Sequence, residues 1–436
     1  MSSKQLALSN SMPPDCVYFG VDVWAQNATS LTHPRTTYGG GGTKTGHAVT
    51  KLAEIGLSVG VFAPAWSFEH FPGRGRALEK AMWDGTSVPE NIDCACGKAS
   101  VQHPSNREFP ITRSARDFPA GSSSFFYTDF SRAFGRHKNE QNHLWGGKAL
   151  HSQVASRSLL PHMNNTSYSK MDIGCSINSL SMHLEDLPGS TQLVVETRSL
   201  IPLNPKFHQD TTINDPDNPK MYDRYLPLFN LNIATTEPLR LRIVFNFLLD
   251  DPTACVVPAF YIKCSGVSGI KFFSIDRLGR NIIEATQTLQ DERINEIGFH
   301  LHAPAFSEEV ERVVEIMEIC IAPLSSASIA CNIDCIRIEE RSEGETRHKR
   351  LCWTYSRERT DEIANNGIPF SAITGPFSYF VVEINELELG RAYALEYILD
   401  EALREKLGVG KTLKVKITGI GFDGRKITES WARVLI

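Results

Sequence analysis

The sequence contains no run of about 18 apolar residues, the length that a membrane-spanning helix requires. Its opening stretch, MSSKQLALSNSMPPD, also has no apolar segment of the length that a signal peptide needs. Neither a secreted protein nor a membrane protein is expected from these absences. We therefore predict a cytosolic protein that does not associate with a membrane.

Blocks of basic residues are absent as well. The net charge is −5, and lysine and arginine are not clustered as they are in nucleic-acid-binding proteins. Hydrophobic residues make up 41% of the chain and charged residues 22%, which is typical of a folded globular protein. At 436 residues the chain is long enough for two or three domains.

The ten cysteines do not form a pattern typical of a metal site. Cys94 and Cys96 form a CxC pair and Cys331 and Cys335 a CxxxC pair, but neither has a second pair at ligand spacing. A glycine run from Gly39 to Gly42 precedes Lys44 without completing a phosphate-binding loop. We therefore predict reduced thiols, no metal and no cofactor.

The first 150 residues alternate between strand and helix patterns. Val17–Trp24 and Ser58–Ala63 are short apolar runs typical of buried parallel strands, and Ser124–Phe130 is interpreted as a third strand. Between them, helices are predicted over Thr43–Ile55, with Thr43 or Thr45 as its cap, and over Arg76–Met82. This order predicts a parallel sheet with crossover helices. Three strands do not complete such a sheet, so the segment is interpreted as part of a larger one.

After residue 150 the pattern changes to strand-length runs rich in Val, Ile and Phe, separated by turn residues. This pattern is typical of antiparallel β-sandwiches. A charged stretch, Glu339–His348, is interpreted as a linker between two of them. The expected domains are thus residues 1–150, residues 151–345 as a jelly-roll or carbohydrate-binding-like sandwich, and residues 346–436 as an immunoglobulin-like or fibronectin-like sandwich.

Three stretches of the first segment resemble glycoside hydrolase family 85, the endo-β-N-acetylglucosaminidases. They are VYFGVDVW with TTYGGGGT, then GLSVGVFAPAWSFE, then FFYTDFSRAFGRH. The resemblance is clear over about the first 160 residues and looser beyond them. It implies the C-terminal part of a (β/α)₈ barrel followed by two β-sandwiches. It also implies cleavage of the chitobiose core of N-glycans, in which the acetamide oxygen of the substrate is the nucleophile.

The resemblance further implies a general acid/base Glu with an Asn two residues earlier, on a strand before those seen here. The catalytic pair is therefore expected upstream of this chain, which would be a truncated member that is inactive alone or needs a separate N-terminal half-barrel. The only Asn-x-Glu in the first segment, Asn106–Glu108, lies in a polar stretch flanked by proline rather than at the end of an apolar strand. The alternative function is that of a non-catalytic glycan-binding or scaffold protein that uses the two sandwiches.

Five residues are candidates for contacts with the glycan: Asp22, Trp24, Trp66, Tyr127 and Asp129. Each lies at or just beyond the end of an expected barrel strand, where the active face of such a barrel is built. Tyr127 and Asp129 are two positions apart and should share one face of their strand. Each residue has a simpler interpretation as a core aromatic or as a group that braces the barrel interior.

Overall fold

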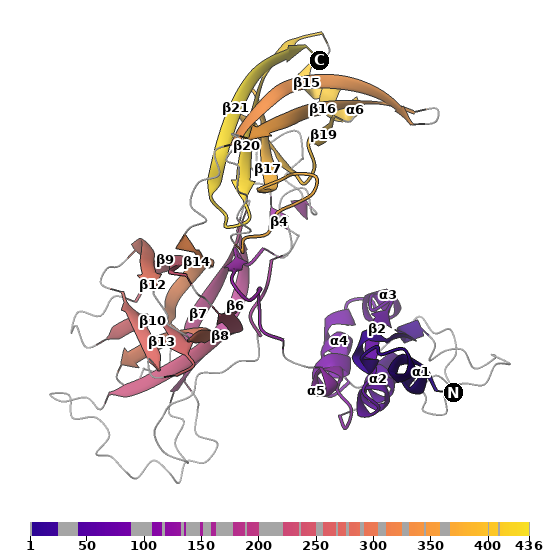
Figure 1. Ribbon diagram of the computed structural model, residues 1–436, viewed down its shortest axis with the longest axis vertical. Coiled ribbons are helices and arrows are strands. Elements are labelled where there is room, and N and C mark those ends of the chain that lie inside the picture. Colours follow the sequence, from indigo (N-terminus) through magenta and orange to yellow (C-terminus); the bar gives the residue numbers. More distant parts are fainter. Residues whose placement is uncertain are drawn as a thin grey trace. The chain divides into compact units, whose positions relative to one another are not determined.

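The computed structural model forms two compact units, Met1–Asp117 and Phe118–Ile436. Figure 1 shows that helices predominate in the first unit and that the second consists almost wholly of strands. The described residues are 2–24, 42–88, 107–115, 118–131, 135–136, 149–150, 158–162, 178–187, 190–199, 221–234, 237–249, 256–266, 269–275, 279–287, 292–303, 311–324, 331–343, 346–357, 367–399, 401–408 and 410–435.

The first unit contains two parallel strands, β1 (Tyr18–Asp22) and β2 (Ser58–Phe62), joined through a helix as the sequence predicts. In their register Tyr18 lies opposite Ser58 and Asp22 lies opposite Phe62. The remaining elements of this unit are α1 (Ser3–Ser9), η1 (Pro14–Cys16), η3 (Gly42–Lys44), α2 (Thr45–Glu54), α3 (Trp66–His70), α4 (Gly75–Asp84) and α5 (Ile111–Ser114).

The helix ends follow local chemistry, with two differences from the prediction. The opening stretch forms α1, because Ser2 and Gln5 cap each other reciprocally across its first turn. Helix α2 starts at Thr45 after a short 3₁₀ turn, and its capping residue is Lys44 rather than a threonine. The helix ends at Glu54 and is followed by Gly56 at φ +78°, a conformation that glycine adopts without a Cβ penalty.

The two faces of the β1–β2 pair differ in burial. Val59 and Val61 pack against the core of the unit, which is formed by Val23, Val49, Trp66, Phe71, Leu78, Met82 and Ile111. On the opposite face Tyr18 is 71% exposed and Phe62 is 66% exposed. A Cβ placed at Gly20 or Gly60 would meet no heavy atom within 4 Å. One face of this parallel sheet is therefore bare within the described part of the unit.

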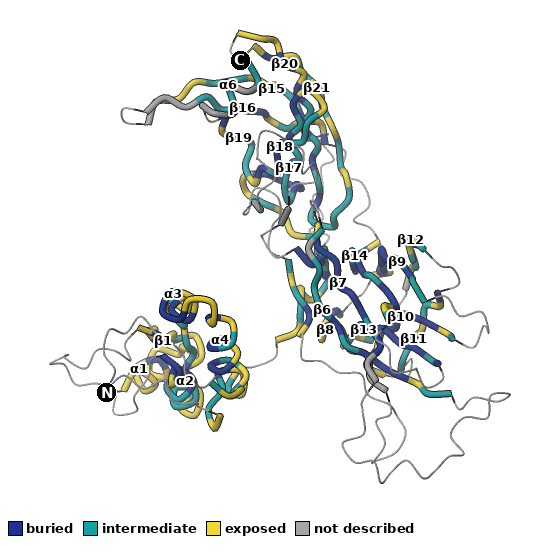
Figure 2. Tube along the Cα trace, turned by 180° about the vertical axis from the view of Figure 1, so that it is seen from behind, coloured by how far each residue is buried: buried dark blue, intermediate teal, exposed yellow. Residues whose placement is uncertain are grey.

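In the second unit, two antiparallel sheets contribute side chains to one large core. Figure 2 shows its buried residues concentrated along these strands. The four-stranded sheet has the order β11-β10-β13-β8, and the six-stranded sheet runs β12-β9-β14-β7-β6 with β3 on β14. The strands are β3 (Phe126–Thr128), β6 (Asn178–Leu187), β7 (Ser190–Ser199), β8 (Tyr222–Ala234), β9 (Leu239–Phe247), β10 (Val257–Cys264), β11 (Ile270–Ser274), β12 (Gly279–Gln287), β13 (Arg293–Ala303) and β14 (Arg312–Pro323).

A second core in this unit lies between two further sheets, β15-β16-β19 and β18-β17-β20-β21. The turn between the paired strands β20 and β21 contains Gly424 at φ +74°, a conformation that glycine adopts without a Cβ penalty. The elements are β15 (Cys331–Glu343), β16 (Thr346–Arg357), β17 (Phe377–Ile384), β18 (Leu387–Ala392), β19 (Glu396–Leu399), α6 (Glu401–Leu407), β20 (Thr412–Gly421) and β21 (Lys426–Leu435). The short strands β4 (Gly135–Arg136) and β5 (Ala149–Leu150) pair with each other.

The interpretation of Ser124–Phe130 as a third barrel strand is wrong. Strand β3 pairs antiparallel with β14, with Tyr127 opposite Cys320, so it belongs to the second unit. The first compact unit accordingly ends at Asp117 rather than at 150. The apolar pattern of a short buried strand is the same in a parallel and in an antiparallel sheet, and only the pairing partner distinguishes them.

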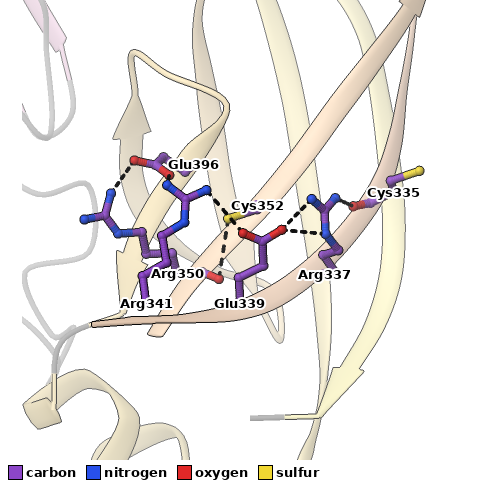
Figure 3. A network of polar contacts seen from close by, with 7 residues as sticks. All are labelled: Cys335, Arg337, Glu339, Arg341, Arg350, Cys352 and Glu396. Atoms are coloured by element: carbon purple, nitrogen blue, oxygen red, sulfur yellow. Dashed lines mark hydrogen bonds and ion pairs between the residues drawn. The ribbon is translucent and has the colours of Figure 1, made fainter. Parts of the chain in front are cut away.

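The charged linker expected at Glu339–His348 is also wrong. The described residues of this stretch, 339–343 and 346–348, lie in the antiparallel strands β15 and β16, in which Glu343 pairs with Thr346, so the change between the two cores falls before Cys331. Glu339 accepts hydrogen bonds from Arg337 Nε at 2.8 Å and from Arg341 Nη2 at 3.2 Å, and Arg341 also pairs with Glu396 of β19 at 3.3 Å (Figure 3). Opposite charges therefore alternate along one face of the strand and pair with each other. The composition of this stretch resembles that of a linker, but its charges stabilise a strand.

Candidate functional site

The carboxyl end of β1 carries the first two candidate residues. Asp22 is the last residue of the strand and lies on its exposed face, and its Oδ1 accepts a hydrogen bond from the backbone N–H of Trp24 at 2.9 Å. This contact fixes the turn that follows β1. The side chain of Trp24 remains 38% exposed. In the described part of the chain, Oδ2 of Asp22 has no hydrogen-bond partner.

The carboxyl end of β2 leads into α3, which carries Trp66 and His70. Trp66 is fully buried, and its ring stacks on that of His70 with centroids 5.5 Å apart and planes 18° apart. The ring of Trp24 meets the same imidazole edge-on at 5.4 Å. His70 therefore lies between the two tryptophans. The ends of β1 and β2 bring Trp24, Trp66 and His70 together as one aromatic cluster.

Burial lowers the pKa of His70 below its usual value, because desolvation disfavours the charged ring. The imidazole is thus neutral at neutral pH and can donate one hydrogen bond and accept one. An exposed tryptophan beside a carboxylate is a combination suited to a polar ring with apolar C–H faces, such as a sugar. Trp66 supports this surface from within the core.

His70 was missed by sequence reasoning, although a signal for it existed. It lies four residues after Trp66, so the two side chains must share one face of any helix that contains both. A short WSFEH stretch does not by itself predict a helix, because isolated helices of this length are unstable in water. The tertiary packing against Phe71 and Trp24 is what orders it.

Tyr127 and Asp129 lie in the second unit, where they connect its two β regions. Asp129 accepts hydrogen bonds from the backbone N–H of Ser131 at 3.1 Å and from the Ser158 hydroxyl, and it pairs with Arg391 at 3.9 Å. The guanidinium of Arg391 lies 4.4 Å from the ring centre of Tyr379. These contacts join β3 to β17 and β18. They give the two residues a bracing role that their sequence positions do not reveal.

The phenol of Tyr127 is buried in the same junction. A Cβ at Gly424, in the turn between β20 and β21, would come within 2.4 Å of its oxygen, so only glycine fits there beside Tyr127. Burial raises the pKa of Tyr127 well above its usual value, and the neighbouring carboxylate of Asp129 raises it further. Tyr127 therefore stays neutral at any physiological pH.

Several sequence features lie outside the described residues or do not contribute to the aromatic cluster. Gly39 to Gly41, Cys94, Cys96 and Asn106 are not described. Glu108 is exposed, and its backbone carbonyl accepts a hydrogen bond from Arg113 at 2.9 Å. Within the described ranges no group of three His, Cys, Asp or Glu side chains could hold a metal ion. No helix among these ranges is long and apolar enough to cross a membrane.

Comparison with known proteins finds a family model that matches part of the chain and solved structures that are similar to it. The family model for glycosyl hydrolase family 85 matches residues 1–138. Among solved structures, the glycoside hydrolase domain of Endo-D from Streptococcus pneumoniae R6 is similar, with a TM-score of 0.55 at 11% sequence identity. That match covers 98% of this chain and 59% of the Endo-D chain, so this protein spans less than two thirds of the solved one. At this identity the likeness concerns the fold.

Weaker likenesses to solved structures carry no inference. The adhesin domain of Epf from Streptococcus pyogenes has a TM-score of 0.21 at 9% identity, over 72% of this chain and 92% of that one. An isomalto-dextranase of Arthrobacter globiformis T6 has a TM-score of 0.18 at 10% identity, over 47% and 33%. No curated protein matches the chain.

Proposed function

We propose that this chain, whose residues 1–138 match the family model for glycosyl hydrolase family 85, acts on N-glycans as an endo-β-N-acetylglucosaminidase family protein. The family match over the segment that holds Trp24, Trp66 and His70 is the observation that carries the proposal. The fold likeness to the glycoside hydrolase domain of Endo-D supports it. Among the described residues no two cysteines form a disulfide, which suits a protein of the reducing cytosol.

The substrate bond is the one between the two N-acetylglucosamines of the glycan core. In the proposed mechanism the substrate's acetamide oxygen attacks the anomeric carbon, and a Glu protonates the leaving oxygen and then activates water. An Asn two residues before that Glu orients the acetamide. Such a Glu requires a raised pKa and a site from which water is largely excluded.

In this proposal β1 and β2 are two strands of a (β/α)₈ barrel, and the two pairs of antiparallel sheets are β-sandwiches. The bare face of Tyr18, Gly20 and Phe62 supports the first part, because parallel sheets are stable when both faces are covered. Further parallel strands, in this or another chain, are proposed to cover this face. They would also supply the Asn-x-Glu pair.

Within the first unit, Trp24 is proposed to stack on a sugar ring and Asp22 to accept a hydrogen bond from a hydroxyl. Oδ2 of Asp22, which accepts no hydrogen bond from the described residues, is the acceptor for this second role. Trp66 and His70 hold the ring of Trp24 in place from the core side. Tyr127 and Asp129 are left out of this site, since their contacts brace the second unit.

Binding of a high-mannose glycopeptide to the purified chain tests this assignment. Trp24→Ala should lower the affinity about tenfold, which corresponds to 1.4 kcal/mol of stacking energy. Phe118→Ala removes an aromatic ring that is 78% exposed but lies outside the first unit, and it serves as the matched control. Equal affinities of the two variants for the glycopeptide would rule out the proposed role of Trp24.

Hydrolysis is measured in the same samples by mass spectrometry of the peptide product. The chain by itself should leave the glycopeptide intact, because no Asn-x-Glu at a strand end is found in it. Release of the glycan with a single N-acetylglucosamine left on the peptide would show that the acid/base group is present after all. Glu108→Gln would then be the first variant to examine.

A non-catalytic glycan-binding protein is the second candidate. The observation that favours it lies in the large β portion of the chain. On the outer face of its four-stranded sheet, Phe272 is exposed, and Asp223 and His302 on the same sheet form a hydrogen bond. The test is to mix the chain with a separate polypeptide that supplies the further barrel strands. Binding of glycans without cleavage in this mixture would support the binding protein over the enzyme.

A further inference from the structure

The outer face of the four-stranded sheet in the second unit carries a cluster of rings. Tyr225 of β8 lies opposite His300 of β13 in the register, with ring centres 4.6 Å apart. Phe272 of β11 lies 5.0 Å from His300 and 6.2 Å from Tyr225. These side chains point away from the core, since their strand neighbours Leu226, Phe299 and Leu301 are the buried core residues.

One polar edge borders these rings. Oδ1 of Asp223 lies 2.9 Å from Nε2 of His300 and 2.9 Å from Nδ1 of His302. Both histidines thus donate to the same carboxylate oxygen and hold it in place. We call Asp223, Tyr225, Phe272, His300 and His302 together the β13 face.

The packing within this face is close, since the ring of Tyr261 lies beside that of Tyr225 with centres 5.6 Å apart. Gly298 lies opposite Tyr261 across the sheet, and a Cβ at this glycine would come within 2.4 Å of the tyrosine ring. The hydroxyl of Tyr261 donates to Glu296 at 2.8 Å. Because Tyr261 has no spare room against Gly298, the neighbouring rings and the carboxylate are held in a fixed arrangement, and a ligand would find them already ordered.

Three side chains of the β13 face are accessible to solvent. Phe272 is 46% exposed, and the side chains of Asp223 and His302 are 48% and 37% exposed. Oδ2 of Asp223 and Nε2 of His302 make no hydrogen bond within the described part of the chain. An apolar ring and two unused polar atoms therefore lie around one small area.

We propose that the β13 face is a second glycan-binding site, in which Phe272 stacks on the C–H face of a pyranose and Asp223 and His302 bind its hydroxyls. A pyranose has the same two surfaces, apolar C–H groups on one side and a rim of donors and acceptors. A carboxylate that is held in place by two imidazole N–H groups accepts hydrogen bonds from hydroxyls strongly. The choice of a glycan as ligand rests on the proposed function.

Other ligands fit the face less well. A phosphate or sulfate group would be repelled by the carboxylate of Asp223, which both histidines of this face contact. A metal ion would need three ligating side chains together, and no such group was found among the described residues. Phe272 would have no role in binding either ion, whereas it provides the largest contact area for a sugar.

Titration calorimetry with a free high-mannose glycan tests the proposal on the full chain carrying Trp24→Ala, which disables the site proposed in the first unit. Binding should persist in this background. Adding Phe272→Ala should weaken it about tenfold, as expected for 1.4 kcal/mol of stacking, and Phe272→Tyr should restore it. Asp223→Asn should also weaken binding, because the carboxylate loses its charge.

Ile282→Ala is the matched control, since Ile282 is an apolar strand residue of the same unit that is 57% exposed. Its affinity should equal that of the background. Absence of binding at millimolar glycan, or equal losses for Phe272→Ala and Ile282→Ala, would overturn the β13 face as a site. Failure of Trp24→Ala to change the affinity of the wild-type chain would instead count against the first site alone, so the two proposals are separable.

Discussion

The ion pair between Arg240 of β9 and Asp423 joins the two β regions of the second unit, and its loss should be costly. Arg240 Nη2 lies 2.8 Å from Asp423 Oδ2, and the two side chains are only 9% and 14% exposed. At this distance and an effective dielectric constant of about 20, the attraction is about 6 kcal/mol before desolvation is subtracted. Little water can replace either partner.

Asp423→Ala would leave the buried guanidinium of Arg240 without its carboxylate. Removing one partner of a buried pair costs about 3–5 kcal/mol in free energy of unfolding. The double variant Arg240→Met with Asp423→Leu removes both charges and should lose much less, because no unpaired charge remains buried. The positive coupling between the two substitutions is the specific prediction.

Urea unfolding followed by far-ultraviolet circular dichroism measures these changes, since the β-rich second unit dominates that signal. Lys426→Ala is the control, because its ion pair with Glu429 in the same hairpin is exposed and contributes little. The reasoning is refuted if Asp423→Ala unfolds within about 1 kcal/mol of the wild type, well below the range for a buried pair. It is equally refuted if the double variant loses as much stability as Arg240→Met and Asp423→Leu lose in sum when each is measured singly.

Two further outcomes are expected. Trp66→Ala should destabilise the first unit by about 3–5 kcal/mol, because it removes a fully buried ring, whereas Phe68→Ala on the same helix removes a half-exposed one and should cost much less. Hydrogen exchange of the α2 amides reports both, and similar protection in the two variants would contradict the buried position of Trp66. Stability of the second unit should fall as the pH drops below about 6.5, because burial lowers the pKa of His300 despite its hydrogen bond with Asp223, so the unfolded chain takes up the proton first. The pKa of Asp223 is also lowered, since hydrogen bonds from His302 and His300 outweigh the effect of burial, and its contribution is lost only at still lower pH. The free energy of unfolding in urea, measured at pH 7.5 and 5.5, tests this. His300→Gln keeps a hydrogen-bond donor but cannot titrate, so its stability should change less between the two pH values. The same change in the variant and the wild type would assign the pH dependence to other groups.

How far the sequence predicts this protein can be seen in particular elements. The short apolar runs of β1 and β2 were sufficient to predict these strands, because period and composition are local properties. The first unit's aromatic cluster was predicted in part, through Trp24 and Trp66. His70 escaped because its helix forms only through packing against the rings around it.

The sequence by itself determined which segments form strands, the parallel pairing of β1 with β2 and the resemblance to family 85. Only the tertiary structure decided how the other strands pair, and with that the position of Tyr127 in the sheet of β14 and of Asp129 beside Arg391. It also showed that the charged stretch at Glu339, which we expected to be a linker, lies in a strand that pairs with its neighbour. The physical reason is that strand pairing joins residues far apart in the chain, through backbone groups that every sequence shares and local pattern therefore cannot encode.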